Sequence, residues 1–140
     1  MTLLRRLARR HRLEAGVVIV AVLDDAGAIR DSVAIGRPAD GPDQSRAEPE
    51  PVSTILRTAT DALDLRRRHE LRLAGVRCRT GPAVWFGDDL RWRATLAAEA
   101  VALRIRLGPC ALVTDHGWRV DDDSAGRLPA LDVVRRPRQW

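Results

Sequence analysis

The stretch that decides the fold reads GVVIVAVLDDAGAIRDSVAIG and runs from Gly16 to Gly36. Residues 17–23 within it are apolar throughout, which is typical of a central strand covered on both faces of a sheet. The next four residues, DDAG, suit a tight turn because Gly27 accepts a left-handed backbone. A second strand is expected over residues 28–35. The stretch therefore predicts a β-hairpin whose first strand lies in the middle of a sheet.

Outward from this hairpin, apolar residues recur at helical spacing in three segments. They predict helices over residues 2–13, 53–68 and 88–107, and Gly108 and Pro109 are expected to stop the last one. Further strands are expected over residues 71–79, with a bulge at Gly75, and over residues 110–120. Residues 83–86 fit a short strand or a packed loop, and residues 130–134 an edge strand.

This alternation predicts an α/β fold with a central mixed β-sheet and flanking helices, in a single three-layer domain. The basic amphipathic helix is assigned to residues 1–14, the α/β domain to residues 15–134 and a basic tail to residues 135–140. Residues 37–51 contain four prolines and four acids without apolar periodicity. They are expected to form an exposed, mobile loop.

Composition limits the function classes. The chain has 140 residues, of which 45% are hydrophobic, so one domain with a real core is expected. No apolar run approaches the roughly 20 residues of a membrane span, and no signal-peptide pattern follows the Arg-rich start. A cytoplasmic protein without a membrane partner is therefore expected, with Cys78 and Cys110 as reduced thiols.

All 24 basic residues are arginine, and the net charge is +5. Arginine binds phosphate and carboxylate through a planar fork, so the predicted partner is nucleic acid or an acidic protein; a homodimer stays open. Residues 66–106 hold ten arginines against four acids, with Trp85 and Trp92 interleaved. Solvated helix faces and helix ends are the alternative explanation for the same residues. The candidate binding residues are Arg5, Arg6, Arg9, Arg10, Arg66, Arg67, Arg68, Arg77 and Arg79.

Catalytic patterns are weak. A zinc site would need Cys78, Cys110, His11, His69 and His116, none of which forms a closely spaced pair. Asp115 and His116 suggest a general base, but neighbours on the predicted strand point to opposite faces. A ribonuclease-H-like magnesium site would draw on Asp24, Asp25, Asp61, Asp88, Asp89 and Asp115. We expect neither a cofactor nor a bound metal.

Several segments together resemble a known family. They are VLDDAGAIRDSVAIG at residues 22–36, ILRTA at residues 55–59, RCRTGP at residues 77–82, and the DH pair at residues 115–116. With the helix expected from Asp88, this order resembles a RadC-like JAB/MPN domain over about residues 13–120.

This chain differs from the active members of that family at the metal-binding positions. In active members two histidines and a later aspartate hold zinc, and an upstream glutamate acts as acid and base. Here Arg77 and Arg79 stand in the histidine places and Asp88 or Asp89 in the aspartate place. Arginine stays protonated and cannot ligate zinc, so the resemblance implies a degenerate metal site in which these arginines pair with an aspartate.

The favoured function is therefore a non-catalytic binding or scaffold protein, a pseudoenzyme with an Arg-rich surface. The alternative is a metal-dependent hydrolase or nuclease, either JAB-like or ribonuclease-H-like.

Overall fold

The hairpin at residues 16–36 forms as predicted. Strand β1 (Val17–Leu23) pairs antiparallel with β2 (Ile29–Gly36), and Val17 lies opposite Gly36. The turn between them is closed by the Gly27 N–H, which donates to the Asp24 carbonyl over 2.9 Å. The Asp24 carboxylate also accepts the N–H groups of Ala26 and Ala28. The computed structural model describes residues 2–36, 52–66, 68–121, 125–127 and 131, and the predicted loop 37–51 and tail 135–140 lie outside them.

A mixed six-stranded sheet grows from this hairpin in the order β2-β1-β3-β4-β5-β6. Its other strands are β3 (Arg72–Cys78), β4 (Arg106–Thr114), β5 (Gly117–Val120) and β6 (Ala125–Gly126). Among the described strands, only β3 and β4 are parallel, because helix α3 crosses over between them; the other pairs are antiparallel. The predicted α/β class with a central mixed sheet is confirmed.

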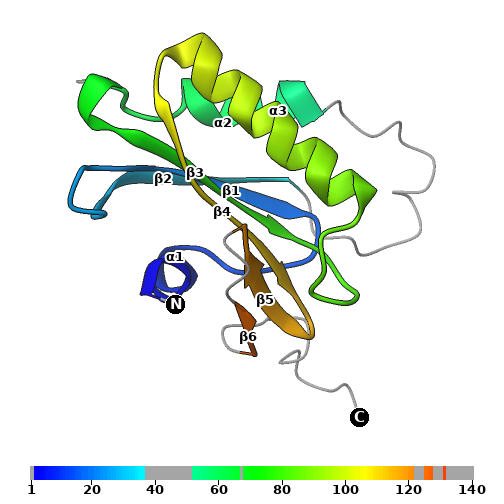
Figure 1. The fold of residues 1–140 in the computed structure, drawn as a ribbon. Helices are drawn as coiled ribbons and strands as arrows, with labels where there is room; N and C mark the ends of the chain where they lie inside the picture. Colours follow the sequence, from blue (N-terminus) through cyan, green and yellow to red (C-terminus); the bar gives the residue numbers. More distant parts are fainter. Residues whose placement is uncertain (1, 37–51, 67, 122–124, 128–130, 132–140) are drawn as a thin grey trace.

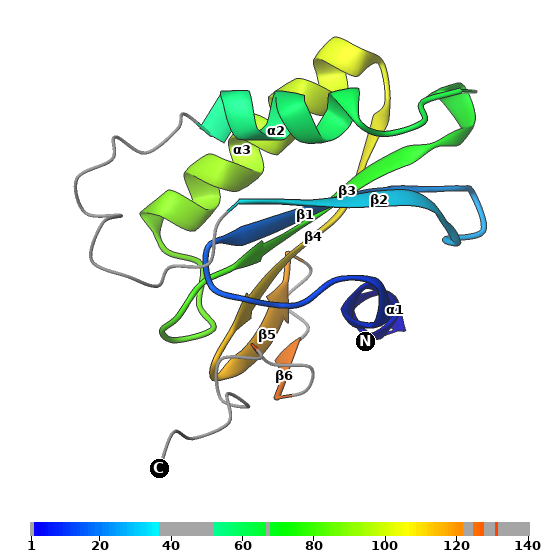
Figure 2. The same cartoon turned by 180° about the vertical axis from the view of Figure 1, so that it is seen from behind.

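Helices cover both faces of the sheet, which makes three layers (Figures 1 and 2). Helix α1 (Thr2–Arg10) lies on one face, where Leu4 and Leu7 pack against alternate residues of β1 such as Ile19. Helices α2 (Val52–Asp61) and α3 (Gly87–Leu103) lie on the other face, against Val20 and Val22. Strand β1 is apolar at every position because each of its faces meets a helix layer.

The close approach of α3 to the sheet depends on Gly75 in β3. A Cβ atom at this position would lie 2.5 Å from Cδ2 of Leu96 and 2.9 Å from Cη2 of Trp92. Trp92 is 1% exposed and therefore belongs to the core. The expected irregularity at Gly75 appears as a register shift between β3 and β4, while the pairing of β3 with β1 stays regular.

Two helices end earlier than predicted. Helix α2 stops at Asp61 rather than Arg68, because the N–H groups of Ala62 and Leu63 bond three residues back and tighten the turn. Arg66 therefore lies beyond the helix. Helix α3 stops at Leu103, and Arg104 follows in the left-handed conformation with φ 59°.

The early end of α3 changes the role of the next segment. Gly108 and Pro109 belong to β4 instead of ending the helix. Leu107, the last residue of the predicted helix 88–107, is 41% exposed in this strand.

The segment 110–120 is not one strand but parts of two, β4 and β5, joined by a turn at Asp115 and His116. The first predicted helix ends at Arg10, and the segment 83–86 is a loop. The short strand β6 was not predicted. Of the predicted edge strand 130–134, only Leu131 is described. No helix in the described ranges is long and apolar enough to cross a membrane.

Candidate functional site

Arg77 and Arg79 lie at the end of β3, next to the start of α3. They share the side of the strand on which Gly75 meets α3, because side chains alternate along a strand. Asp89 stands in the first turn of α3, where its carboxylate accepts the Phe86 N–H over 2.8 Å and caps the helix. The strand end and the helix start are therefore held face to face.

The two arginines share one buried carboxylate. Arg79 binds Asp89 through two parallel hydrogen bonds, each of 2.8 Å, from Nε to Oδ1 and from Nη2 to Oδ2. Nε of Arg77 lies 3.4 Å from Oδ1 of the same carboxylate, whose side chain is 1% exposed. The contact predicted between these arginines and Asp88 or Asp89 is therefore present, with Asp89 as the acid.

Arg79 donates four hydrogen bonds to described residues. Besides Asp89, it donates to the carbonyl oxygens of Thr80 over 3.0 Å and Val84 over 2.7 Å. Its guanidinium carbon lies 5.3 Å from the centre of the Phe86 ring. Arg79 thus clamps the loop between β3 and α3 and has little capacity left for a ligand.

The charge of Asp89 is stabilised in place. Burial alone would raise the pKa of Asp89, but the hydrogen bonds from Arg79 and the Phe86 N–H, together with the charges of Arg79 and Arg77, lower it. The carboxylate is therefore ionised at neutral pH. Two guanidinium groups against one carboxylate leave this cluster with one net positive charge.

Arg77 is less committed than Arg79. Its Nη1 donates to the Asp88 carbonyl over 2.9 Å. Nη2 has no hydrogen-bond partner among the described residues, and the side chain is 24% exposed. One end of this guanidinium is therefore available to an anion.

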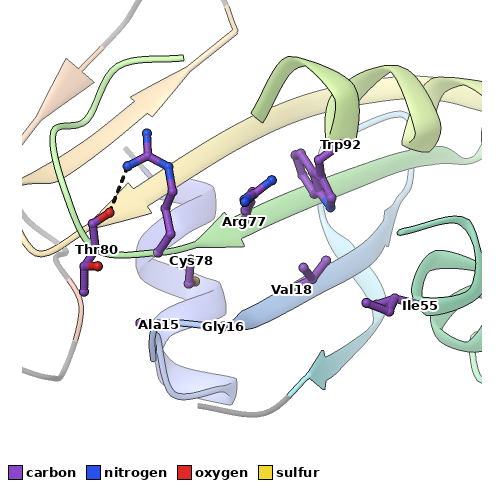
Figure 3. Close-up of a pocket in the computed structure, with 9 residues that line it drawn as sticks. Ala15, Gly16, Val18, Ile55, Arg77, Cys78, Thr80 and Trp92 are labelled. Carbon is purple, nitrogen blue, oxygen red and sulfur yellow. Dashed lines mark hydrogen bonds between the residues drawn. The ribbon is translucent and has the colours of Figure 1, made fainter. Parts of the chain in front are cut away.

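A pocket of about 320 Å³ opens beside Arg77 (Figure 3). Side chains from four elements project into the same region: Val18 from β1, Arg77 from β3, Ile55 from α2 and Trp92 from α3. The indole N–H of Trp92 is buried and has no acceptor within the described part of the chain. The described residues that line it are Ala15, Gly16, Val18, Ile55, Arg77, Cys78, Arg79, Thr80 and Trp92.

Sequence reasoning missed this pocket. The available signal was Arg77 itself, a charged residue at a helix-facing position near the end of β3, after the apolar residues 73–76. The pocket's other walls come from segments far apart in the chain, so no sequence pattern marks them.

A separate basic surface lies on α1. Its exposed residues Arg5, Arg6, Arg9 and Arg10 form no ion pair with any described residue. At 100° per residue they occupy one arc of the helix, opposite the buried Leu4 and Leu7. We call these four residues the α1 arginine face.

The remaining basic candidates belong neither to the cluster around Asp89 nor to the α1 arginine face. Arg66 is engaged by Asp64, with Nη2 2.7 Å from Oδ2. Arg67 lies outside the described residues, and Arg68 begins the 3₁₀ helix η2 (Arg68–Glu70). The nine predicted residues are therefore distributed over different elements.

The catalytic candidates do not assemble. Within the described ranges, no three His, Cys, Asp or Glu side chains are close enough to hold a metal ion. Oδ2 of Asp115 lies 3.9 Å from Nε2 of His116, while Oδ1 accepts the Gly81 N–H over 2.8 Å. Asp115 therefore holds a turn instead of orienting His116.

The thiols are also unsuited to nucleophilic attack. Cys78 and Cys110 are both buried, and neither forms a disulfide. Burial raises the pKa of Cys110 to about 12, with a further contribution from the charge of Asp121. Its thiol is protonated at neutral pH, whereas the thiolate is the reactive form.

Comparisons with known proteins do not assign this chain to a family. No protein-family model, no curated protein and no solved structure matches this chain.

Proposed function

We propose that this chain is a non-catalytic binding protein whose α1 arginine face binds the phosphates of nucleic acid. The observation that carries the proposal is a nine-residue helix with four exposed arginines and no acidic partner in the described structure. Arginine forms forked, charge-assisted hydrogen bonds with phosphate.

The arrangement of this face favours a polyanion. Arg5 and Arg9, and likewise Arg6 and Arg10, are four residues apart, where like charges on a helix repel each other. A bound row of phosphates would relieve this repulsion. The helix is also a firm platform, because Leu4 and Leu7 on its other side are at most 1% exposed.

Nucleic acid fits this face better than an acidic protein does. Protein interfaces have an apolar or aromatic centre surrounded by polar residues. The α1 arginine face offers only guanidinium groups, while Leu3 and Ala8 are turned toward the core. Charge without an apolar centre suits contact with a phosphate backbone, which is independent of base sequence.

The cluster at β3 supports a non-catalytic role in the same proposal. We propose that Arg77, Arg79 and Asp89 occupy the place of a metal site in a JAB/MPN-like domain that no longer binds metal. The support is the pair of short hydrogen bonds by which Arg79 occupies both oxygens of Asp89. Two buried cysteines that form no disulfide are compatible with a cytoplasmic location, which we also propose.

The test is fluorescence anisotropy with labelled RNA and DNA oligonucleotides, single-stranded and duplex, over a series of salt concentrations. We expect log K to fall linearly with log salt concentration, by about 0.7–0.9 per phosphate contact. The variant Arg6→Gln/Arg10→Gln should reduce this slope by roughly 1.5. The matched control, Arg57→Gln/Arg91→Gln, removes the same charge from the exposed surfaces of α2 and α3 and should change affinity much less.

Three outcomes would contradict the proposal. Equal losses for the two double variants would show that only net charge matters. Binding of a poly-glutamate peptide, but of no oligonucleotide, would favour an acidic protein partner. Magnesium-dependent cleavage of the oligonucleotide that is lost in a carboxylate variant would establish the nuclease alternative.

A further inference from the structure

We propose that the pocket between β1, β3, α2 and α3 binds a small apolar monocarboxylate, with Arg77 as the group that holds its carboxylate. The proposal involves no residue of α1, so it is independent of nucleic-acid binding. It rests on the charge of the cluster, the free end of Arg77 and the character of the pocket walls.

The charge at the pocket is unbalanced. Among the described residues, Asp89 is the only carboxylate paired with Arg77 and Arg79, and Arg79 already occupies both of its oxygens. Asp88 is exposed and makes no ion pair in the described structure; it contributes only its backbone carbonyl to Arg77. A single additional anion would therefore neutralise the cluster.

The position of Arg77 is set before any ligand arrives. The hydrogen bond to Asp88 and the 3.4 Å contact with Asp89 hold its Nη1 and Nε. Nη2 keeps both of its N–H groups unengaged among the described residues. A ligand carboxylate would thus meet an oriented donor with little loss of side-chain freedom.

The apolar pocket walls favour a carboxylate ligand whose remaining part is apolar. Among the described residues, Ala15, Val18, Ile55 and Trp92 form apolar walls of the pocket. Arg77 and Arg79 are its charged side chains in that part of the chain, and only Arg77 has a guanidinium nitrogen without any hydrogen bond. The pocket volume of about 320 Å³ is near the lower limit of small-molecule sites, which are about 300–1,000 Å³. A phosphate dianion would need more donors than this pocket offers, because burying an unpaired charge is costly.

The probe is 3-phenylpropanoate, a monocarboxylate with an aromatic ring, followed by NMR of the tryptophan indole N–H signals. The Trp92 signal, assigned with Trp92→Phe, should shift saturably. The neutral analogue 3-phenylpropanamide should bind at least about tenfold more weakly, because it lacks the charge-assisted bond. Acetate, which lacks the ring, should also bind at least about tenfold more weakly.

Variants separate the two parts of the site. Arg77→Met should abolish the preference for carboxylate over amide, whereas Arg91→Met, an exposed arginine next to Trp92, should leave it unchanged. Ile55→Phe narrows the pocket without altering Arg77 and should weaken both aromatic probes. Thermal unfolding of each variant shows whether it remains folded, and Ile55→Phe keeps the test decisive if Arg77→Met does not.

Three results would overturn the proposal. The first is the absence of a saturable shift at millimolar 3-phenylpropanoate. The second is equal affinity for the carboxylate and the amide in the wild-type chain. The third is a carboxylate preference that survives in folded Arg77→Met.

Discussion

The arginines of β3 and those of α1 are the same residue type in opposite situations. Arg77 and Arg79 have side chains only 24% and 18% exposed, and both reach one buried carboxylate. The α1 arginine face is exposed and unpaired in the described structure. Arg77 and Arg79 are part of the framework that joins the sheet to α3. The α1 arginine face makes no ion pair within the described structure.

This difference has energetic consequences. A buried ion pair is costly to break from one side, because the remaining charge loses its partner. Exposed charges in water contribute little to stability, and repulsion between like charges reduces even that. The variants below test whether the division between framework and free surface is correct.

The largest effect is expected at Asp89. Asp89→Asn removes the charge that holds both arginines and should lower the free energy of unfolding by about 3–5 kcal/mol, measured by urea denaturation. The neighbouring Asp88→Asn is the control. Asp88 is exposed in the same helical turn, so its loss should cost only about 0.3–1 kcal/mol through the helix dipole. Similar losses for the two variants would show that Asp89 is not part of the framework.

The same pair predicts a pH dependence. The pKa of Asp89 is lowered from its ordinary value of 3.8, so its stabilising contribution is present above that value and is lost as pH falls through the lower folded-state pKa. The stability gap between wild type and Asp89→Asn should therefore stay constant from neutral pH to about pH 5 and narrow in more acidic solution. Urea denaturation as a function of pH measures this gap. A gap that is unchanged at the lowest pH would contradict the role of the carboxylate's charge.

Gly75→Ala should have an intermediate effect. The added Cβ would crowd Leu96 and Trp92 and push α3 away from β3, at a cost of about 1–3 kcal/mol. The carboxylate of Asp89 travels with α3, so the contact with Arg79 should loosen as well. Gly87→Ala is the control, because a Cβ there meets nothing within 4 Å. Thermal unfolding of both variants measures the difference.

The smallest effect is expected on α1. Arg10→Gln removes the repulsion between Arg6 and Arg10 and should change the free energy of unfolding by at most about 0.5 kcal/mol, toward greater stability. Urea denaturation at low salt, where repulsion is strongest, is the measurement. A loss of more than about 1 kcal/mol would mean that Arg10 has a structural partner and that the contrast with β3 is wrong.

Much of the fold was predictable because its strongest signals are local. An uninterrupted apolar run followed by DDAG places β1 and its turn, since both the pattern and the turn chemistry lie within the hairpin. The helix ends were not predictable. After α3, Arg104 takes a left-handed conformation although it is not glycine. After α2, the N–H of Asp64 donates to the carboxylate of Asp31 on β2, which lies far away in the sequence.

The sequence by itself determined that arginines stand at the end of one predicted element and aspartates at the start of the next, with a short connection between them. Only the tertiary structure decided that Asp89 rather than Asp88 receives them, since the helix turns Asp89 toward the sheet and Asp88 toward solvent. It also decided which arginines remain free and where the pocket lies. Both properties depend on distances between segments such as β1, α2 and α3, which no local pattern contains.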